Sequence, residues 1–90
     1  MSTTAEIAAR IATDIETLGH YQAHLPRSSF NCVCIITAPG WPRNDDTAQN
    51  DLLIAICEKV GLPVEVPLDP VIRWNDTTPT EEVIETLRSL

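Results

Sequence analysis

The sequence predicts a mainly α-helical fold, a small single-core bundle of three amphipathic helices with a short central apolar segment. Three stretches of the chain place apolar residues three and four positions apart, which is the spacing of one helix face. Each stretch opens with residues that cap helix N-termini, and glycine or proline interrupts the chain between them. A chain of 90 residues suits one small core, so we expect residues 1–90 to form a single domain.

The first predicted helix begins after Thr3 and ends before Gly19. Thr3 and Glu6 stand at the spacing of a capping box, in which each side chain bonds the backbone N–H of the other residue. We expect Gly19 to end the helix as a left-handed cap. The predicted buried face comprises Ile7, Ala8, Ile11, Ala12, Ile15 and Leu18.

The second predicted helix runs from Asp46 to about Val60. Asp46 and Gln49 have the spacing of a second capping box, and Gly61 is placed to close the helix. The apolar spacing within this stretch predicts one buried side. Its members are Leu52, Leu53, Ile56, Cys57 and Val60.

The last predicted helix covers about residues 79–89, with Thr78 as its N-cap and Glu81 completing a capping box. Pro79 suits the first helical position because its fixed φ is already helical. Just before this start, Asn75 and Asp76 are expected to form a polar turn by bonding nearby backbone groups. Trp74 would then close the core beneath that turn. Together with Trp41, the residues Trp74, Asn75 and Asp76 are our candidates for a binding or structural signature.

Two segments between the predicted helices are harder to assign. Residues 30–38 are short, apolar and followed by Pro39-Gly40, so they belong to the core, but periodicity does not separate a strand from a helix there. Their β-branched content favours a strand locally. Three prolines predict an extended conformation for residues 62–71, and alternating apolar residues within it leave open a short edge strand. A minor two-stranded β pairing is therefore an open alternative.

The charge of the chain limits the classes of partner that we expect it to bind. The net charge is −7, with residues 41–90 carrying ten acids against four bases. This balance argues against direct nucleic-acid binding, which needs clustered Lys and Arg. It agrees with a basic protein partner, with mimicry of nucleic acid towards a basic groove, or with an acidic surface that only keeps the protein soluble.

Four histidine and cysteine residues suggest two kinds of chemistry. His20, His24, Cys32 and Cys34 offer ligands for a structural zinc ion. Alternatively, one of the cysteines could act as a nucleophile with a histidine as its base and Asn75 or Asp76 as orienting group. The Cys-x-Cys spacing fits a chelating pair poorly, and no local signature surrounds either thiol. We therefore expect no cofactor, no metal and no catalytic residue, and keep a cysteine- or zinc-dependent enzyme as the alternative.

Nothing in the sequence predicts export or membrane insertion. Residues 1–25 lack the basic start and apolar run of an export signal, and the longest apolar stretch, residues 52–57, is far too short to cross a bilayer. Three cysteines without an export signal are typical of reduced thiols in a cytoplasm. We expect a cytoplasmic protein with a protein partner, no membrane contact, and a homodimer as a further option, since small cores gain stability by association.

The order of these motifs resembles the actinobacterial and actinophage proteins grouped as domain of unknown function family 6197. The residues that carry the resemblance are Cys34, Ala38, Trp74-Asn75-Asp76, Glu82-Val83-Ile84 and Leu87. The chain departs from the family pattern at His20, where the family tends to have Trp, and at Thr37, where it tends to have Gly. The resemblance implies a small phage-encoded or bacterial accessory protein without catalysis, in the host cytoplasm if phage-encoded. We therefore expect a small acidic non-enzymatic protein that acts by protein binding.

Overall fold

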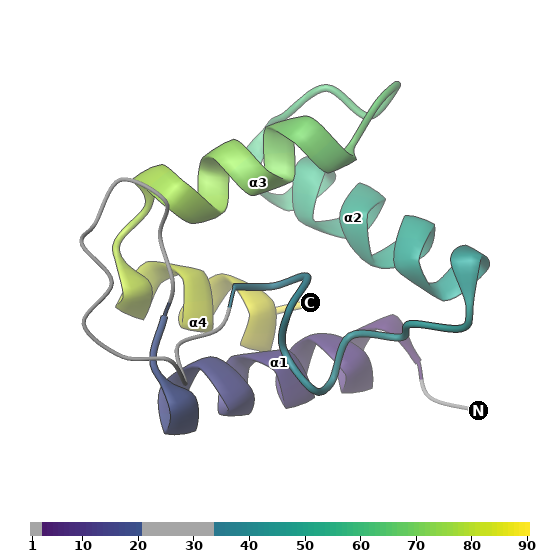
Figure 1. The fold of residues 1–90 in the computed structure, drawn as a ribbon. Helices are drawn as coiled ribbons and strands as arrows, with labels where there is room; N and C mark the ends of the chain where they lie inside the picture. Colours follow the sequence, from purple (N-terminus) through teal and green to yellow (C-terminus); the bar gives the residue numbers. More distant parts are fainter. Residues whose placement is uncertain (1–2, 21–33) are drawn as a thin grey trace.

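The computed structural model describes residues 3–20 and 34–90, and this part of the chain is mainly helical (Figure 1). The prediction of a mainly α fold is thus confirmed, although the described part contains one helix more than the predicted three. It also contains no strand, so the short edge strand that the sequence left open between residues 64 and 68 is absent. The helices are α1 (Thr4–Leu18), α2 (Asp46–Val60), α3 (Leu68–Thr77) and α4 (Thr80–Arg88).

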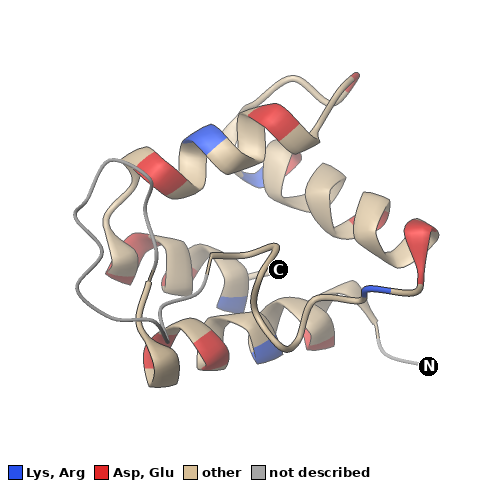
Figure 2. Cartoon of the chain, in the orientation of Figure 1, with Lys and Arg blue, Asp and Glu red and all other residues tan. Residues whose placement is uncertain are grey.

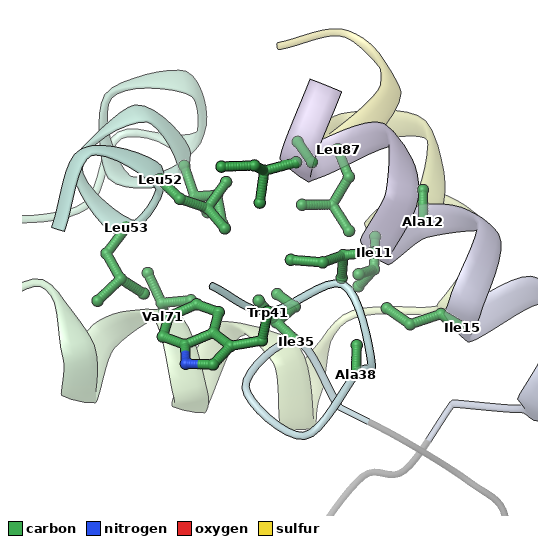
Figure 3. Close-up of a cluster of buried hydrophobic side chains, with 14 of the residues drawn as sticks. Ile11, Ala12, Ile15, Ile35, Ala38, Trp41, Leu52, Leu53, Val71 and Leu87 are labelled. Atoms are coloured by element: carbon green, nitrogen blue, oxygen red, sulfur yellow. The ribbon is translucent and has the colours of Figure 1, made fainter. Parts of the chain in front are cut away.

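The helices surround one apolar cluster. α1 packs chiefly against α4, and α2 contacts α1, α3 and α4. Residues 34–45 pass between the α1–α4 side and the α2–α3 side of the molecule (Figure 1). Side chains from all these elements meet in the centre, among them Ile11, Leu52, Val71 and Leu87, none of which is more than 1% exposed (Figure 3). No helix in the described part is long and apolar enough to cross a membrane.

Local capping sets the limits of α1. The capping box is present as predicted, because the Thr3 N–H donates to Glu6 Oε1 at 3.1 Å and the Glu6 N–H donates to Thr3 Oγ1 at 3.2 Å. Gly19 ends the helix with φ of 97°, but its ψ of 151° is extended rather than left-handed helical. The expected left-handed cap is therefore wrong in detail, since the chain straightens directly after α1.

The N-cap of α2 lies one residue earlier than predicted. Asp45, not Asp46, is the N-cap, and its side chain accepts a hydrogen bond from the Ala48 N–H at 3.0 Å. Gln49 takes no part in a capping box; its side-chain amide donates instead to the carbonyl of Pro42 at 2.8 Å. Gly61 closes the helix with φ of 80° and ψ of 34°, which confirms the predicted left-handed cap.

The extent of α3 shows that two predictions were wrong. Residues 68–71 are helical rather than extended, and Trp74, Asn75 and Asp76 lie inside the helix rather than in a turn. Pro70 is the third residue of α3, where its missing N–H costs nothing because the first turn has no intrahelical acceptors for its N–H groups. The prolines of this region therefore permit a helix that begins at Leu68.

α4 begins at Thr80, within one residue of the predicted start. Pro79 occupies the N-cap position and its carbonyl accepts from the Val83 N–H at 3.1 Å, so Thr78 is not the N-cap as predicted. Thr78 instead follows the end of α3 and is buried. On the outer surface Arg88 of α4 forms a salt bridge with Glu16 of α1, with an N–O distance of 3.1 Å.

The described part of the central segment, residues 34–41, consists of turns. The Ala38 N–H donates to the Cys34 carbonyl, and the Trp41 N–H donates to the Ala38 carbonyl, each at 3.0 Å. This local bonding makes residues 34–38 a single helical turn, so the local preference for a strand is not met there; residues 30–33 lie outside the described part. Ile35, Ala38 and Trp41 are buried, which confirms that the segment belongs to the core.

Candidate functional site

His20 joins three helices through its imidazole ring. It follows Gly19 at the end of α1, and its Nε2 lies 2.7 Å from Asn75 Oδ1 of α3. Its Nδ1 lies 2.9 Å from Thr80 Oγ1, in the first residue of α4. Each contact spans more than fifty residues of sequence, so the ring fixes how the ends of α1, α3 and α4 meet.

The partners of Asn75 show which group donates in its hydrogen bond with His20. Asn75 Nδ2 donates to Asp76 Oδ1 at 3.2 Å, which leaves Asn75 Oδ1 as the group that faces His20. An amide oxygen only accepts, so His20 Nε2 carries a proton and donates it. The Thr80 hydroxyl can either donate to Nδ1 or accept from it, so the direction of that bond follows the tautomer of the ring. Three hydrogen bonds thus connect Thr80, through His20 and Asn75, to the Asp76 carboxylate.

The order hydroxyl, imidazole and amide also occurs in nucleophile–base–orienter triads. Two features favour a structural role here. Asn75 is uncharged, so it stabilises an imidazolium less than a carboxylate would. Asn75 is also only 2% exposed, and hydrogen bonds such as those to His20 and Asp76 are what a buried amide requires. We therefore interpret His20, Asn75 and Thr80 as a clasp, and use that name for them below.

A pocket of about 280 Å³ adjoins the clasp. One wall is the turn of residues 34–37, and the other is the side of α3 that carries Val71, Ile72, Asn75 and Asp76. Aliphatic side chains line most of the pocket, while Asn75 and Asp76 form its polar edge. Its volume lies just below the usual range for ligand pockets, and its mixture of apolar walls with few polar groups is typical of them.

The two described cysteines have different surroundings. Cys34 is half-buried at the pocket wall, and the Thr37 hydroxyl lies 3.4 Å from its Sγ. Cys57 is fully buried in α2, and this burial raises the pKa of its thiol, which keeps it protonated and unreactive. Both nitrogens of His20 are engaged by Asn75 and Thr80, so Cys34 would have to displace one of these hydrogen bonds to use His20 as its base.

The structure places the four signature candidates in different surroundings. Asn75 and Asp76 lie at the edge of the pocket, and Cys34 faces them across it. Trp74 is half-buried against the core from the outer part of α3. Trp41 belongs to the core itself, in the same cluster as Ile35 and Val71 (Figure 3).

The zinc alternative is only partly covered by the structure. In residues 3–20 and 34–90 no group of three His, Cys, Asp or Glu side chains lies close enough to hold a metal ion. His24 and Cys32 lie outside the described residues, so the four-residue ligand set stays an untested alternative. The engagement of both His20 nitrogens by the clasp does not favour it, because a metal would have to displace one of these bonds.

An exposed apolar surface was not anticipated from the sequence. All the large apolar side chains that are exposed in the described part lie within residues 64–72, which we call the 64–72 surface. The alternation of apolar residues at positions 64, 66 and 68 was the only signal, and it was interpreted as an edge strand. Ile72 belongs both to this surface and to the pocket. The exposed members are Val64 (41%), Val66 (64%), Leu68 (42%) and Ile72 (38%).

Comparison of the chain with protein-family models, with curated proteins and with solved structures gives no match. The family resemblance based on Trp74-Asn75-Asp76 therefore stays a prediction. What is known of the clasp, the pocket and the 64–72 surface comes from the contacts of this chain alone.

Proposed function

We propose that this chain is a small acidic accessory protein that acts by binding another protein chain and not by catalysis. The observation that carries the proposal is the 64–72 surface. Contiguous exposed apolar residues are uncommon on small soluble domains and mark sites of interaction. Here they are confined to a single stretch, while the other large apolar side chains of the described part are at least partly buried.

The surroundings of this surface support binding. Ile72 connects it to the pocket, so an apolar group of a partner has a recess to enter. The floor of that recess is held firmly, because Asn75 is fixed by His20 and Val71 is only 1% exposed. A preformed recess beside exposed apolar residues lowers the ordering cost of association.

The distribution of charge supports protein binding over mimicry of nucleic acid. Acidic residues are spread over all four helices (Figure 2). A mimic of a nucleic-acid backbone needs its negative charges gathered along one path, so that they face a basic groove together. Negative charge that is spread over the helices in this way suits solubility.

The resemblance to domain of unknown function family 6197 supports an actinobacterial or phage source for the protein.

Site-specific photo-crosslinking tests the proposal. A photoreactive amino acid replaces Ile72 in one protein and Thr13, an exposed residue of α1, in a matched control. After irradiation in an actinobacterial lysate, we expect protein adducts at position 72 that position 13 does not give. Adding excess unlabelled protein should suppress them, whereas excess Ile72→Asp protein should not. Equal adducts at both positions, or none at position 72, would contradict the proposal.

A further inference from the structure

We propose that the 64–72 surface pairs two copies of this chain, with the two α3 helices antiparallel and Val66 of each copy seated in the pocket of the other. The inference rests on the proposed function, because it names the partner for the same surface. Three features of one chain support it: exposed charges of both signs on α3 that form no ion pair within the described residues, a protruding side chain before the start of α3, and a recess beside its second half.

The charges on the exposed side of α3 are complementary to themselves. Asp69 and Arg73 are both exposed and stand one helical turn apart, yet they form no ion pair within the described residues. A wholly basic partner would place like charge against Arg73, and a wholly acidic one would do so against Asp69. In an antiparallel pair related by a twofold axis, Asp69 of each copy faces Arg73 of the other, so two ion pairs form and each of the four charges has one partner.

The same register brings the protruding side chain to the recess. In an antiparallel pair, a step back along one chain is matched by an equal step forward along the other. When Asp69 faces Arg73, Leu68 at the start of α3 therefore lies level with Trp74 of the second copy. Val66, in the non-helical segment just before Leu68, then lies near the end of that second α3, where Asp76 stands. Val66 has the most exposed apolar side chain of the surface, and Asp76 lies at the edge of the pocket. One arrangement thus pairs the charges and fills the recess.

Leu68 and Ile72 complete the contact. They are four residues apart, so they lie on one side of α3, and both are about two-fifths exposed. α3 packs chiefly against α2, which leaves this side without a neighbouring helix in the described part. Pairing would remove Val66, Leu68 and Ile72 of each copy from water, and a small core gains stability from such association.

Sedimentation equilibrium of the purified full-length chain tests the dimer. We expect the apparent mass to rise from that of one chain towards two as concentration increases. Val66→Asp and Ile72→Asp should remain monomeric at concentrations where the unmodified chain is mostly dimeric. Thr13→Asp adds the same charge at an exposed position of α1 and should dimerise normally. Circular dichroism of each variant identifies any that fail to fold.

Charge exchange tests the register. Asp69→Arg and Arg73→Asp should each weaken the dimer about tenfold, because twofold symmetry makes every substitution count twice. The double variant Asp69→Arg/Arg73→Asp restores opposite charges and should return to within about threefold of the unmodified affinity. A monomer at every concentration, or a double variant no better than the single ones, would overturn the inference. If the chain is monomeric but position 72 still crosslinks to another protein, only this inference fails. If the chain neither dimerises nor crosslinks to another protein from position 72, the proposed function fails too.

Discussion

The α1–α4 pair and α3 show two ways in which one short chain holds a helix. α1 is capped at its start by its own residues, buries one side against α4, and is tied to it on the outside by the Arg88–Glu16 salt bridge. α3 has no side-chain cap at its start and leaves Leu68 and Ile72 exposed. Its position depends instead on Val71 in the core and on Asn75 in the clasp.

The comparison indicates that the α1–α4 pair contributes most of the stability and that α3 provides the surface for interaction. A helix with complete local signals and a covered apolar side needs nothing further from a partner. A helix held by a few buried contacts can leave the rest of its apolar residues free for one. The substitutions below test this separation, from the largest expected effect to the smallest.

Removing core volume between α1 and α4 should have the largest effect. Leu87 is fully buried, so Leu87→Ala should cost about 2–5 kcal/mol of the free energy of unfolding. Ile72→Ala on α3 removes a side chain that is 38% exposed and should cost much less, about 1 kcal/mol or below. Urea denaturation followed by circular dichroism, at low protein concentration, measures both. Similar losses for the two variants would show that α3 contributes to the core as α4 does.

Breaking the clasp should have an intermediate effect. Asn75→Ala leaves the ring of His20 without its acceptor, and we expect a loss of about 1–3 kcal/mol in the free energy of unfolding. His20→Ala should lose a similar amount, and the double variant should lose less than the two together because both act on one network. Thr77→Ala, at an exposed position of the same helix, is the matched control. Strict additivity of His20→Ala and Asn75→Ala would argue against a shared network.

Loss of the α1 cap should have a smaller effect. Thr3→Ala removes the acceptor for the Glu6 N–H and should cost about 1 kcal/mol. Amide hydrogen exchange should speed up in the first turn of α1 and remain unchanged in α3, whose start uses no side-chain cap. Thr17→Ala, near the other end of α1, serves as the control. Faster exchange throughout the protein would mean that the α1 cap stabilises the whole fold rather than one terminus.

Acid should produce the smallest effect, and it should fall on α1. The backbone and hydroxyl bonds from Thr3 lower the pKa of Glu6, and the bond and charge of Arg88 lower the pKa of Glu16. A carboxyl with a lowered folded-state pKa contributes stability above its unfolded-state pKa, and this contribution is lost as the pH falls through the folded-state value. Both carboxylates are exposed, so salt screens the effect.

Urea midpoints measured at neutral and acidic pH test this pH dependence. We expect the midpoint to fall in acid, and to fall less in the Glu6→Gln/Glu16→Gln variant, because the substituted residues no longer titrate. Glu58→Gln, an exposed residue of α2 that forms no ion pair in the described part, should keep the original pH dependence. An identical acid response in all three proteins would assign the effect to other carboxylates.

The extent to which the sequence predicts this fold follows the same division. α1, α2 and α4 were predicted to within about a residue because their caps and apolar spacing are local features. α3 was missed because its prolines suggested an extended chain and because Asn75 and Asp76 favour turns when nothing else bonds them. One of the groups that bond Asn75 is His20, which lies 55 residues away in the sequence. No local pattern contains that contact.

The candidate site was predicted only as a set of residue types. His20, Cys34, Asn75 and Asp76 were selected from the sequence, and the structure brings His20 to Asn75 and places the other three around the pocket. Thr80 was not selected, because its role as a partner of His20 depends on the packing of α4. The 64–72 surface was also missed, since exposure of an apolar residue is a property of its neighbours in space.

The close approach of Gly40 to α1 has a consequence for how this sequence can vary. The Gly40 N–H donates to Asp14 Oδ2 at 2.7 Å, and a β-carbon at position 40 would lie 2.8 Å from Arg10 Cγ and 2.9 Å from that same carboxylate oxygen. Even alanine would push the acceptor away from its donor. Descendants of this chain should therefore keep glycine at position 40 for as long as they keep an acid at position 14. Loss of one should accompany loss of the other, which gives a simple marker of whether a distant sequence still folds in this way.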